Sequence, residues 1–573
     1  MARTHLTQSA EAFLAARDFC LRHRADYETA LRDFTWPRLE QFNWALDYFD
    51  AIATGHDAHA LHIVNEDGSE QVRSFSSMST RSSQLANFLR DRGIRRGDCV
   101  LVMLGNEVAL WESLLALMKI GAVVSPATGL LTEDDVSERI ERGCIRSVIA
   151  GSGFTSKFQH VSGPLTRIVV GLPERDWISF DESHAAPTAF EPDGPTRADD
   201  PLLLYFTSGT TAKPKMVLHT HQSYPVGHLS TLVYTGLQPG DRHWNISSPG
   251  WAKHAWSCFF TPWNAEATVF IYNYPRFHAK SVLAALTRHQ VTTICAPPTV
   301  WRMLVQEPLA DYRVALREAM SAGEPLNPTV IDQVRAAWNL TIRDGYGQTE
   351  TTALVGNTPG AELKPGSMGR PLPGMPIVLL DHDGSPSDEG EVCIDLTDQP
   401  IGLTPGYFGD DRTTSQAMRD GYYHTGDVAI RDDDGYLTFV GRLDDVFKSA
   451  DYRISPFEIE SVLVEHDAVA EAAVVPSLDD IRHSVPKAFV LLAAGYEPTR
   501  ELAGSILAYA AKRLAPYKRV RRIEFADLPK TVSGKIRRVQ LRALEDERRM
   551  RKERVPLEFF EEEFIAGEQR GNS

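Results

Sequence analysis

The sequence predicts an α/β protein with a large N-terminal domain of β/α layers, a β-rich subdomain, and a small α+β C-terminal domain. Three observations support this prediction. Strand-length apolar runs alternate with helical patterns from about residue 60 to 150 and again up to 296, short strands and turns fill about 370–440, and a smaller α/β pattern follows residue 443. Such alternation is typical of a parallel sheet covered on both faces.

Residues 1–50 are predicted to form a helical N-terminal extension. Apolar residues such as Phe13, Leu14, Phe19 and Leu21 recur among charged residues at helical spacing. We expect this extension to pack on the large domain, which we place at 51–442.

The large domain is expected to alternate helices and strands in chain order. Helices are predicted at about 80–92, 108–120, after Thr132 and at 279–289, and strands at 100–103, 122–125, 147–150, 269–272 and 292–296. Pro126 and Pro297 stop two of the strands because proline cannot donate a hydrogen bond to a ladder.

The β-rich subdomain is placed at about 370–440, where Asp-His-Asp-Gly at 381–384 and Asp-Asp-Asp-Gly at 432–435 are turn signals. The small C-terminal domain is placed at 443–545. Its expected elements are a helix starting at Pro456, strands at 471–475 and 488–492, a helix at 501–514 and a strand at 522–525. Residues 546–573 form a charged C-terminal tail, expected either to dock or to fray.

Composition limits the classes of function. The formal charge of −16 disfavours nucleic acid and anionic membranes, since both require a broad basic surface. The six cysteines are scattered singly, which favours a reducing compartment and neither zinc nor a disulfide framework. No apolar run approaches the roughly 18 residues of a membrane span, and the N-terminus lacks the apolar core of a signal peptide. We therefore expect a cytoplasmic protein with no membrane span and no nucleic-acid partner.

Residues 207–215 read Thr-Ser-Gly-Thr-Thr-Ala-Lys-Pro-Lys between two apolar runs, so we expect a loop that joins two strands. Hydroxyls, backbone N–H groups and ammonium charge in such a loop suit a phosphate. The residues concerned are Thr207, Ser208, Gly209, Thr210, Thr211, Lys213 and Lys215. No Gly-Lys-Ser/Thr follows the first glycine, so this is not the common nucleotide loop. Taken alone, the stretch is also compatible with a solvated Ser/Thr-rich turn.

Four further motifs follow in order: Ser-Ala-Gly-Glu-Pro at 321–325, Tyr-Gly-Gln-Thr-Glu-Thr at 346–351, Thr-Gly-Asp at 425–427, and Pro-Lys-Thr-Val-Ser-Gly-Lys at 529–535. With the loop at 207–215, they resemble the AMP-forming acyl-CoA ligase family over roughly residues 55–540. Within that family the chain looks most similar to medium-chain acyl-CoA synthetases, through Tyr205-Phe206, Met216, Trp-Asn-Ile-Ser at 244–247 and Gly250-Trp251.

The resemblance implies ATP, Mg²⁺ and coenzyme A as cofactors. Activation of a carboxylate brings two anions together, so neutralising charge is the main catalytic need. The loop with Lys215 would hold the β- and γ-phosphates, Thr349 would donate to the α-phosphate, and Glu350 would bind Mg²⁺. Alone, Thr349-Glu350 would more often be a helix N-cap with an acidic first turn.

The resemblance also implies a nucleoside site. Asp427 would accept hydrogen bonds from the ribose hydroxyls, with Arg442 as a second ribose contact, although an isolated Gly-Asp is more often a plain turn. The expected adenine contacts are Gly323, Glu324, Asp344 and Tyr346, whose ring would stack on the base.

Lys535 is the expected catalytic cation, bridging the carboxylate and the α-phosphate. On sequence texture alone it would more often be part of a solvated basic turn, Lys-Ile-Arg-Arg at 535–538. The resemblance implies that the small domain is mobile and rotates about Asp444 after adenylation, removing Lys535 and presenting another face for thioester formation.

Two positions depart from the family pattern. Asp451, beside Tyr452 and Arg453 in the segment that lines the coenzyme A tunnel, stands where most members have Gly. Its carboxylate would alter the tunnel, substitute for Gly at positive φ, or weaken thioester formation. Ala212 replaces a loop Gly, which would make the loop backbone differ or stiffen.

For the acyl group, Gly347 stands where acetate-specific relatives carry Trp, so it predicts room for a longer or aromatic acid. Trp251, His254 and Trp256 are candidate pocket walls, or else core aromatics and a satisfied histidine.

We therefore expect an ATP-dependent acid–thiol ligase that converts a carboxylic acid to acyl-AMP and then to its coenzyme A thioester, acting on a medium-chain or aromatic acid in preference to acetate. One alternative is an adenylating ligase that loads an acyl carrier protein, which Asp451 keeps open. Another is a catalytically idle acyl-adenylate binding protein. Whether the chain forms a homodimer is also left open.

Overall fold

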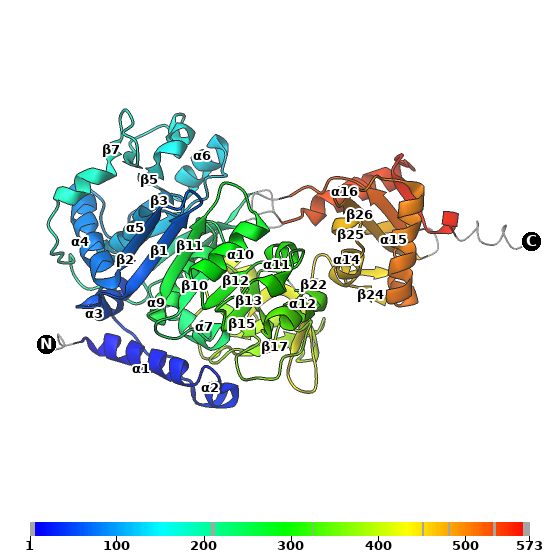
Figure 1. Cartoon of the computed structure of the whole chain (residues 1–573), viewed down its shortest axis with the longest axis horizontal. Helices are drawn as coiled ribbons and strands as arrows, with labels where there is room; N and C mark the ends of the chain where they lie inside the picture. Colours follow the sequence, from blue (N-terminus) through cyan, green and yellow to red (C-terminus); the bar gives the residue numbers. More distant parts are fainter. Residues whose placement is uncertain are drawn as a thin grey trace, which may run out of the picture. The chain divides into compact units, whose positions relative to one another are not determined.

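The structure is a computed structural model that describes residues 6–207, 213–324, 326–449, 452–479, 482–530 and 535–564, without the side chains at 452, 453 and 483. The chain divides into two compact units (Figure 1). Unit 1 comprises Met1–Ile377, Ile394–Tyr423 and Asp433–Leu437, and unit 2 comprises Val378–Cys393, His424–Asp432 and Thr438–Ser573. Each unit is described by itself.

The first sheet of unit 1 has nine strands and is parallel through its centre. Its order is β16 (Arg370–Pro371), β15 (Ala353–Gly356), β14 (Ile342–Gly347), β13 (Glu318–Ala322), β12 (Thr293–Ala296), β10 (Arg242–Asn245), β11 (Thr268–Asn273), β1 (His59–Asn65) and β2 (Glu70–Ser74). Strand β1 lies beside β11, about 200 residues later in the chain, as the blue and green arrows of Figure 1 show. The parallel centre confirms the predicted α/β class.

The second sheet of unit 1 has eight strands. Its order is β19 (Gly406–Tyr407), β9 (Lys215–Thr220), β8 (Pro201–Thr207), β4 (Val123–Pro126), β3 (Cys99–Met103), β5 (Ser147–Gly151), β6 (Thr166–Val170) and β7 (Ile178–Ser179). Strands β8 and β9 are antiparallel, with Thr207 opposite Lys215. This pairing confirms that the stretch 207–215 joins two strands.

Helices cover these sheets because their apolar stripes need a partner surface. They are α3 (Asp50–Ala53), α4 (Phe75–Asp91), α5 (Val108–Ile120), α6 (Glu133–Arg142), α7 (His228–Thr235), α8 (Ala252–Ala255), α9 (Thr261–Asn264), α10 (Ala279–Arg288), α11 (Pro298–Leu304) and α12 (Pro328–Trp338). Helix α13 (Asp411–Ala417) contacts β19 and buries none of its residues. The expected start of α4 at residue 80 is wrong. The helix begins at Phe75 because the Ser74 hydroxyl accepts the Ser77 N–H as its N-cap.

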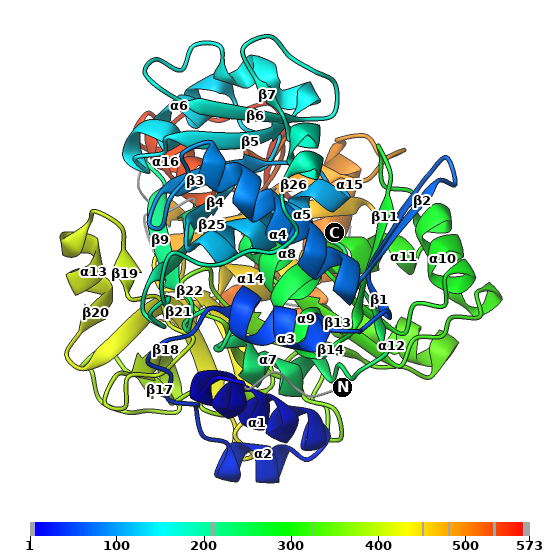
Figure 2. The same ribbon diagram turned by 90° about the vertical axis from the view of Figure 1, so that its left-hand side faces the viewer.

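The N-terminal residues fold as α1 (Gln8–Arg22) and α2 (Tyr27–Asp33). Helix α1 packs on α7 (Figure 2), and Phe13 and Cys20 are fully buried in the main core of unit 1. Arg17 pairs with Glu266 at 2.7 Å. None of the helices formed by the described residues is both long and apolar enough to span a lipid bilayer.

A mixed, strand-rich region follows unit 1's large sheets, with β17 (Ile377–Leu380), β18 (Glu389–Asp395), β20 (Met418–Arg419), β21 (Tyr422–Arg431) and β22 (Leu437–Arg442) in one sheet. The remaining chain of unit 2 contains the hairpin β23 (Phe447–Ser449) and β24 (Tyr452–Ile454), and a four-stranded sheet. That sheet has the order β25 (Val469–Asp479), β26 (His483–Leu492), β27 (Arg522–Phe525) and β28 (Glu558–Phe560). Its helices are α14 (Pro456–Leu463), α15 (Arg500–Arg513) and α16 (Arg538–Met550).

A buried charge cluster holds the end of the chain to the sheet of unit 2. The fully buried Lys487 ammonium on β26 contacts the carboxylates of Glu524, Glu545 and Glu558 at 2.6–2.8 Å. Glu545 comes from α16 and Glu558 from β28. Residues 546–560 are thus integrated by ion pairing, which is strong only because each buried charge has a partner.

Lys487→Met is expected to destabilise unit 2 by about 3–5 kcal/mol, because it leaves three buried carboxylates without their shared cation. Urea unfolding followed by circular dichroism measures the loss. Lys512→Met, at an exposed position of α15, is the matched control and should change stability by less than about 0.5 kcal/mol. Equal stability of the two variants would contradict the importance of this cluster.

Candidate functional site

Lys215, at the end of the phosphate-loop candidate, lies against Tyr407, a residue that the sequence analysis did not identify. Lys215 begins β9, and its ammonium lies 5.1 Å from the centre of the Tyr407 ring. The Tyr407 hydroxyl donates to Glu350 Oε1 at 3.0 Å. Tyr407 therefore contacts Lys215 through its ring and Glu350 through its hydroxyl group. Ser208, Gly209, Thr210, Thr211 and Ala212 lie outside the described residues.

Thr349 and Glu350 are held through their backbones in the turn after β14. The Thr404 N–H donates to the Glu350 carbonyl at 2.8 Å, and His219 Nε2 donates to the Thr349 carbonyl at 2.7 Å. Burial lowers the pKa of His219 to about 4, so the ring is neutral near pH 7 and its other nitrogen can accept from Ser223. Fixed backbones of this kind preorganise the two side chains.

The predicted adenine contacts of unit 1 lie at the carboxyl ends of two neighbouring parallel strands. Ser321 on β13 pairs with Asp344 on β14, so Gly323 and Glu324 follow one strand end while Tyr346 lies at the other. Gly323 has φ +107°, a conformation that side chains disfavour. Ligands of open α/β sheets bind at such strand ends.

Asp344 is buried and accepts hydrogen bonds from the Leu326 N–H at 3.2 Å and the Gly345 N–H at 3.0 Å. Desolvation outweighs these two bonds and raises the pKa of Asp344 to about 7. The carboxyl group is thus poised to change its charge near neutral pH, which a solvated aspartate does not do.

The ribose-type residues lie in unit 2. Asp427 on β21 is buried, and Arg442 Nη1 contacts Asp427 Oδ1 at 3.0 Å. Glu391 supports the turn before Asp427. Its Oε1 accepts the Gly426 N–H at 2.8 Å and its Oε2 lies 2.8 Å from His424 Nδ1. No local sequence signal pointed to Glu391, because it reaches this turn from the neighbouring strand β18.

The predicted hinge segment of unit 2 is tied to α16 by Asp445, the residue after the predicted pivot. Asp444 is exposed, whereas Asp445 pairs with Arg538 at 3.2 Å and Arg542 at 2.6 Å. Lys535 is exposed and precedes α16 by three residues. In the hairpin β23–β24, Ser449 is opposite Tyr452 and Lys448 is opposite Arg453. Asp451 lies outside the described residues.

The candidate acyl-pocket residues have separate packing roles in unit 1. His254 on α8 is buried, contacts Asn106 Oδ1 at 2.9 Å, and has its pKa lowered to about 3 by burial. Trp251 is half-buried, and Trp256 stacks on His228. A Cβ at Gly347 would lie 2.5 Å from the Thr352 carbonyl oxygen. A side chain at 347 would therefore require the backbone of the bulge between β14 and β15 to shift.

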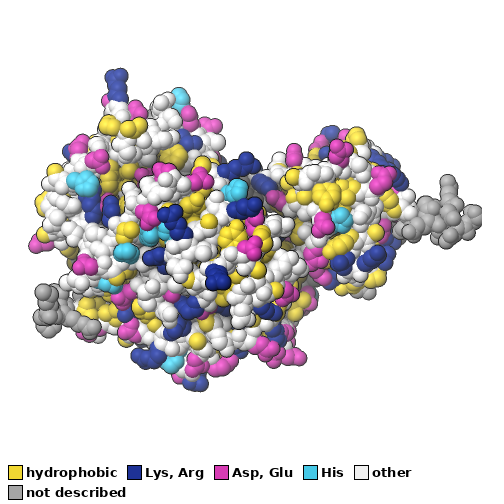
Figure 3. Space-filling view, viewed as in Figure 1, with side chains coloured by type: hydrophobic (Ala, Val, Ile, Leu, Met, Phe, Trp, Pro, Cys, Tyr) yellow, Lys and Arg dark blue, Asp and Glu magenta, His cyan; other side chains and the backbone are white. Residues whose placement is uncertain are grey.

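Basic and acidic side chains are interspersed on the face drawn in Figure 3, with no broad basic patch. Within unit 1, the candidate site offers the Lys215 ammonium beside Tyr407, the buried acid Asp344 and the backbone at strand ends. An arrangement of this kind suits a small anionic nucleotide.

Comparisons with known proteins identify the family. Residues 49–408 match the AMP-binding enzyme family, and residues 458–535 match the AMP-binding enzyme C-terminal domain. The chain belongs to the AMP-binding enzyme family. The predicted resemblance is therefore confirmed.

Two curated relatives match over most of the chain. The 4-hydroxybutyrate–CoA ligase 1 of Metallosphaera sedula is 43% identical over 528 residues, covering 90% of this chain and 93% of the relative. The mitochondrial acyl-coenzyme A synthetase ACSM3 of Mus musculus is 37% identical over 542 residues, covering 91% of this chain and 93% of the relative.

Two solved structures share the fold. The anthranilate CoA ligase AuaEII in complex with anthranoyl-AMP has a TM-score of 0.79 at 27% identity, covering 88% of this chain and 97% of that chain. The benzoate CoA ligase from Burkholderia xenovorans LB400 has a TM-score of 0.75 at 28% identity, covering 87% of this chain and 100% of that chain.

The raised pKa of Asp344 predicts a pH dependence of stability. Between about pH 4, the ordinary aspartate value, and pH 7, the folded protein retains a proton that the unfolded chain releases, so the free energy of unfolding falls as pH rises. Asp344→Asn removes this titration. We expect the thermal-unfolding midpoint of the wild type to fall relative to Asp344→Asn from pH 5 to 8.

The matched control is Asp332→Asn, at an exposed position of α12, whose pH profile should follow that of the wild type. Parallel profiles for Asp344→Asn and the wild type would show that Asp344 does not retain its proton.

Proposed function

We propose that this protein is an AMP-forming acyl-CoA ligase. In the first half-reaction, a carboxylate oxygen attacks the α-phosphorus of ATP to form acyl-AMP and release pyrophosphate. In the second, the coenzyme A thiol attacks the acyl carbon, so that a C–S bond forms, the thiol proton is lost and AMP leaves. The carrying observation is membership of the AMP-binding enzyme family along both the 49–408 and 458–535 segments.

The contacts of unit 1 support the phosphate chemistry. Lys215 supplies a cation beside Tyr407, while Tyr407 holds the Glu350 carboxylate. In the proposal, Lys215 and the loop 207–211 bind the β- and γ-phosphates and Thr349 donates to the α-phosphate. Charge developing on the departing pyrophosphate is then neutralised by groups already in place.

Mg²⁺ is part of the proposal, with Glu350 as its protein ligand. Its carboxylate is a hard oxygen donor of the kind that Mg²⁺ prefers, and the Tyr407 hydroxyl orients it through Oε1. When bound, the ion neutralises phosphate charge.

The nucleoside is assigned to two sets of residues. Gly323, Glu324, Asp344 and Tyr346 are proposed to surround adenine at the strand ends of unit 1. Asp427 and Arg442 of unit 2 are proposed to bind the ribose hydroxyls. Glu391 would hold the turn before Asp427 by accepting the Gly426 N–H. The paired carboxylate and guanidinium suit a hydroxyl pair, because one accepts and the other donates.

The acid is proposed to be medium-chain or aromatic rather than acetate, with Trp251, His254 and Gly347 at its pocket. The relatives named for 4-hydroxybutyrate, benzoate and anthranilate support a substrate larger than acetate. Because the present backbone also leaves little room for a side chain at 347, Gly347 supports this proposal less strongly than the relatives do.

Unit 2 is proposed to move about Asp444 between the half-reactions and to line the coenzyme A path with Asp451, Tyr452 and Arg453. Asp451 favours a second candidate acceptor, the thiol of an acyl carrier protein, because its carboxylate adds charge where most relatives have Gly. A cytoplasmic location is proposed as well. The lack of disulfides among the six cysteines, all within the described chain, supports a reducing compartment.

The function is tested by pyrophosphate release across short, medium and long aliphatic acids and aryl acids, with and without coenzyme A. We expect release with medium-chain or aryl acids, little with acetate, and thioester formation when coenzyme A is present. Pyrophosphate release without thioester on free coenzyme A would favour the carrier-protein acceptor. Absence of acid-dependent pyrophosphate release would contradict ligase activity.

Lys535→Ala is expected to lower the rate of adenylate formation by at least about a hundredfold with little change in ATP affinity, since a cation needed mainly in the transition state is lost. Single-turnover formation of acyl-AMP measures the rate and nucleotide titration measures the affinity. Lys552→Ala, also exposed in unit 2, should leave both unchanged. An unaltered adenylation rate in Lys535→Ala would remove this residue from the mechanism.

A further inference from the structure

Three potential metal ligands meet at the edge of the nine-stranded sheet, on elements that the proposed reaction does not use. His62 lies on β1, Glu70 on the edge strand β2, and His289 caps the C-terminus of α10. One ligand atom from each lies within 4.8 Å of the other two. His62 and Glu70 are only 8 residues apart, but His289 comes from far along the chain.

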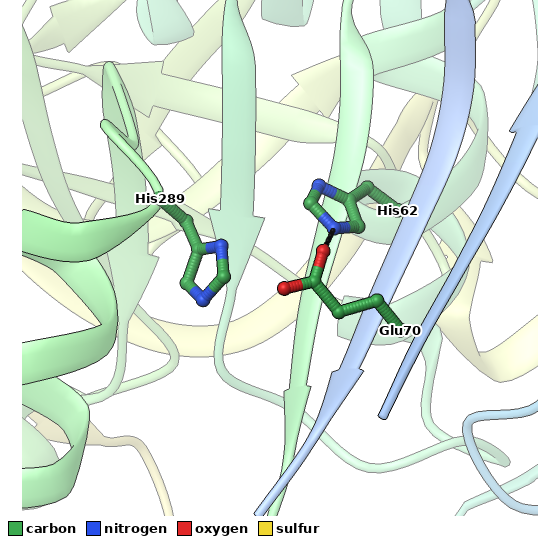
Figure 4. A group of neighbouring side chains, drawn as sticks. All are labelled: His62, Glu70 and His289. Carbon is green, nitrogen blue, oxygen red and sulfur yellow. Dashed lines mark hydrogen bonds and ion pairs between the residues drawn. The ribbon is translucent and has the colours of Figure 1, made fainter. Parts of the chain in front are cut away.

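The sheet register explains why these side chains meet. Glu70 is opposite Val64 on β1, and residues 62 and 64 share a face of the sheet, so Glu70 and His62 are diagonal neighbours. His62 Nε2 lies 2.8 Å from Glu70 Oε2. The His62 and His289 rings are 5.6 Å apart at 85°, and both contact Phe270 on β11. Figure 4 shows the Glu70 carboxylate between the two imidazoles.

We propose that His62, Glu70 and His289 form a binding site for a divalent transition metal ion, with Zn²⁺ as the best match to the donor set. Two imidazole nitrogens and one carboxylate oxygen are a common set of three protein ligands for Zn²⁺, with water in the fourth position. Tetrahedral ligand atoms lie about 3.3 Å apart at zinc bond lengths. The three ligand atoms lie within 4.8 Å of one another in this structure, and rotation of the His289 and Glu70 side chains would bring them to that shorter spacing.

The surroundings favour neutral imidazoles, the form that binds metal. The His62 side chain is 7% exposed and His289 is 9% exposed, and burial lowers the pKa of both rings. The C-terminus of α10 adds partial negative charge beside His289. Two guanidinium groups, Arg242, which donates to the His289 carbonyl, and Arg288, which precedes His289, also lower the pKa of His289, but they repel a cation. The Glu70 carboxylate offsets part of that charge.

Bound metal would tie the edge hairpin β1–β2 to α10 and stabilise this edge of the sheet. The scattered cysteines disfavoured a zinc site, but the group proposed here contains no cysteine. A second group of potential ligands, Glu391, Cys393 and His424, lies in unit 2. A third, Glu524, Glu545 and Glu558, already holds the Lys487 ammonium.

The test is equilibrium dialysis of the chelator-treated full chain against Zn²⁺, followed by metal analysis. The wild type should bind one more equivalent than His289→Ala and Glu70→Gln, whose affinity should fall by at least about tenfold. His59→Ala, which removes an exposed neighbouring histidine, and Cys393→Ser should bind as the wild type does. Equal binding by His289→Ala and the wild type, or loss of the equivalent in Cys393→Ser alone, would overturn the proposal.

A second measurement keeps the test valid if a variant folds poorly. Zn²⁺ should raise the thermal-unfolding midpoint of the wild type and of His59→Ala, but not that of His289→Ala. This readout does not depend on ligase activity. A midpoint that Zn²⁺ raises equally in His289→Ala and the wild type would also overturn the site.

Discussion

The hydrogen bond from Tyr407 to Glu350 joins the two large sheets of unit 1, because Tyr407 belongs to the eight-stranded sheet and Glu350 follows a strand of the nine-stranded one. The register places Lys215 at the same point. Tyr407 is opposite Val217, and residues 215 and 217 share a face of β9, so the tyrosine ring lies diagonal to Lys215. Strand pairing thus places a cation and a carboxylate from different sheets beside the same tyrosine.

Much of this fold could be predicted because the signals are local. The apolar run that became α5, the Thr132 capping box at the start of α6 and the four-residue strand β27 all have boundaries that neighbouring residues decide. The β8–β9 hairpin was predictable for the same reason. The predicted start of α4 was wrong because Ser74 caps the helix several residues before the helical apolar pattern becomes clear in the sequence.

The supporting contacts of the site could not be predicted, since they depend on which distant strands become neighbours. Tyr407 is 57 residues from Glu350, His219 is 130 residues from Thr349, and Glu391 is 35 residues from Gly426. None carries a motif of its own. Gly347 illustrates the converse limit. In the present backbone a side chain at this motif position would meet the Thr352 carbonyl, and the motif alone does not separate this packing effect from a role in substrate binding.

Burial also determines where positive charge for the reaction can arise. His219, His228 and His254 all lie in unit 1, and desolvation lowers the pKa of each well below neutrality, so none contributes positive charge near pH 7. Lys253 donates to the Ala322 carbonyl at 3.0 Å, beside the adenine-type residues rather than beside Glu350. These histidines therefore add no positive charge to that of Lys215 to offset the negative charge of a triphosphate and an incoming carboxylate. In our proposal Mg²⁺ and Lys535 provide further positive charge, and movement of Lys535 away from the α-phosphate after adenylation withdraws the part that the second half-reaction does not need.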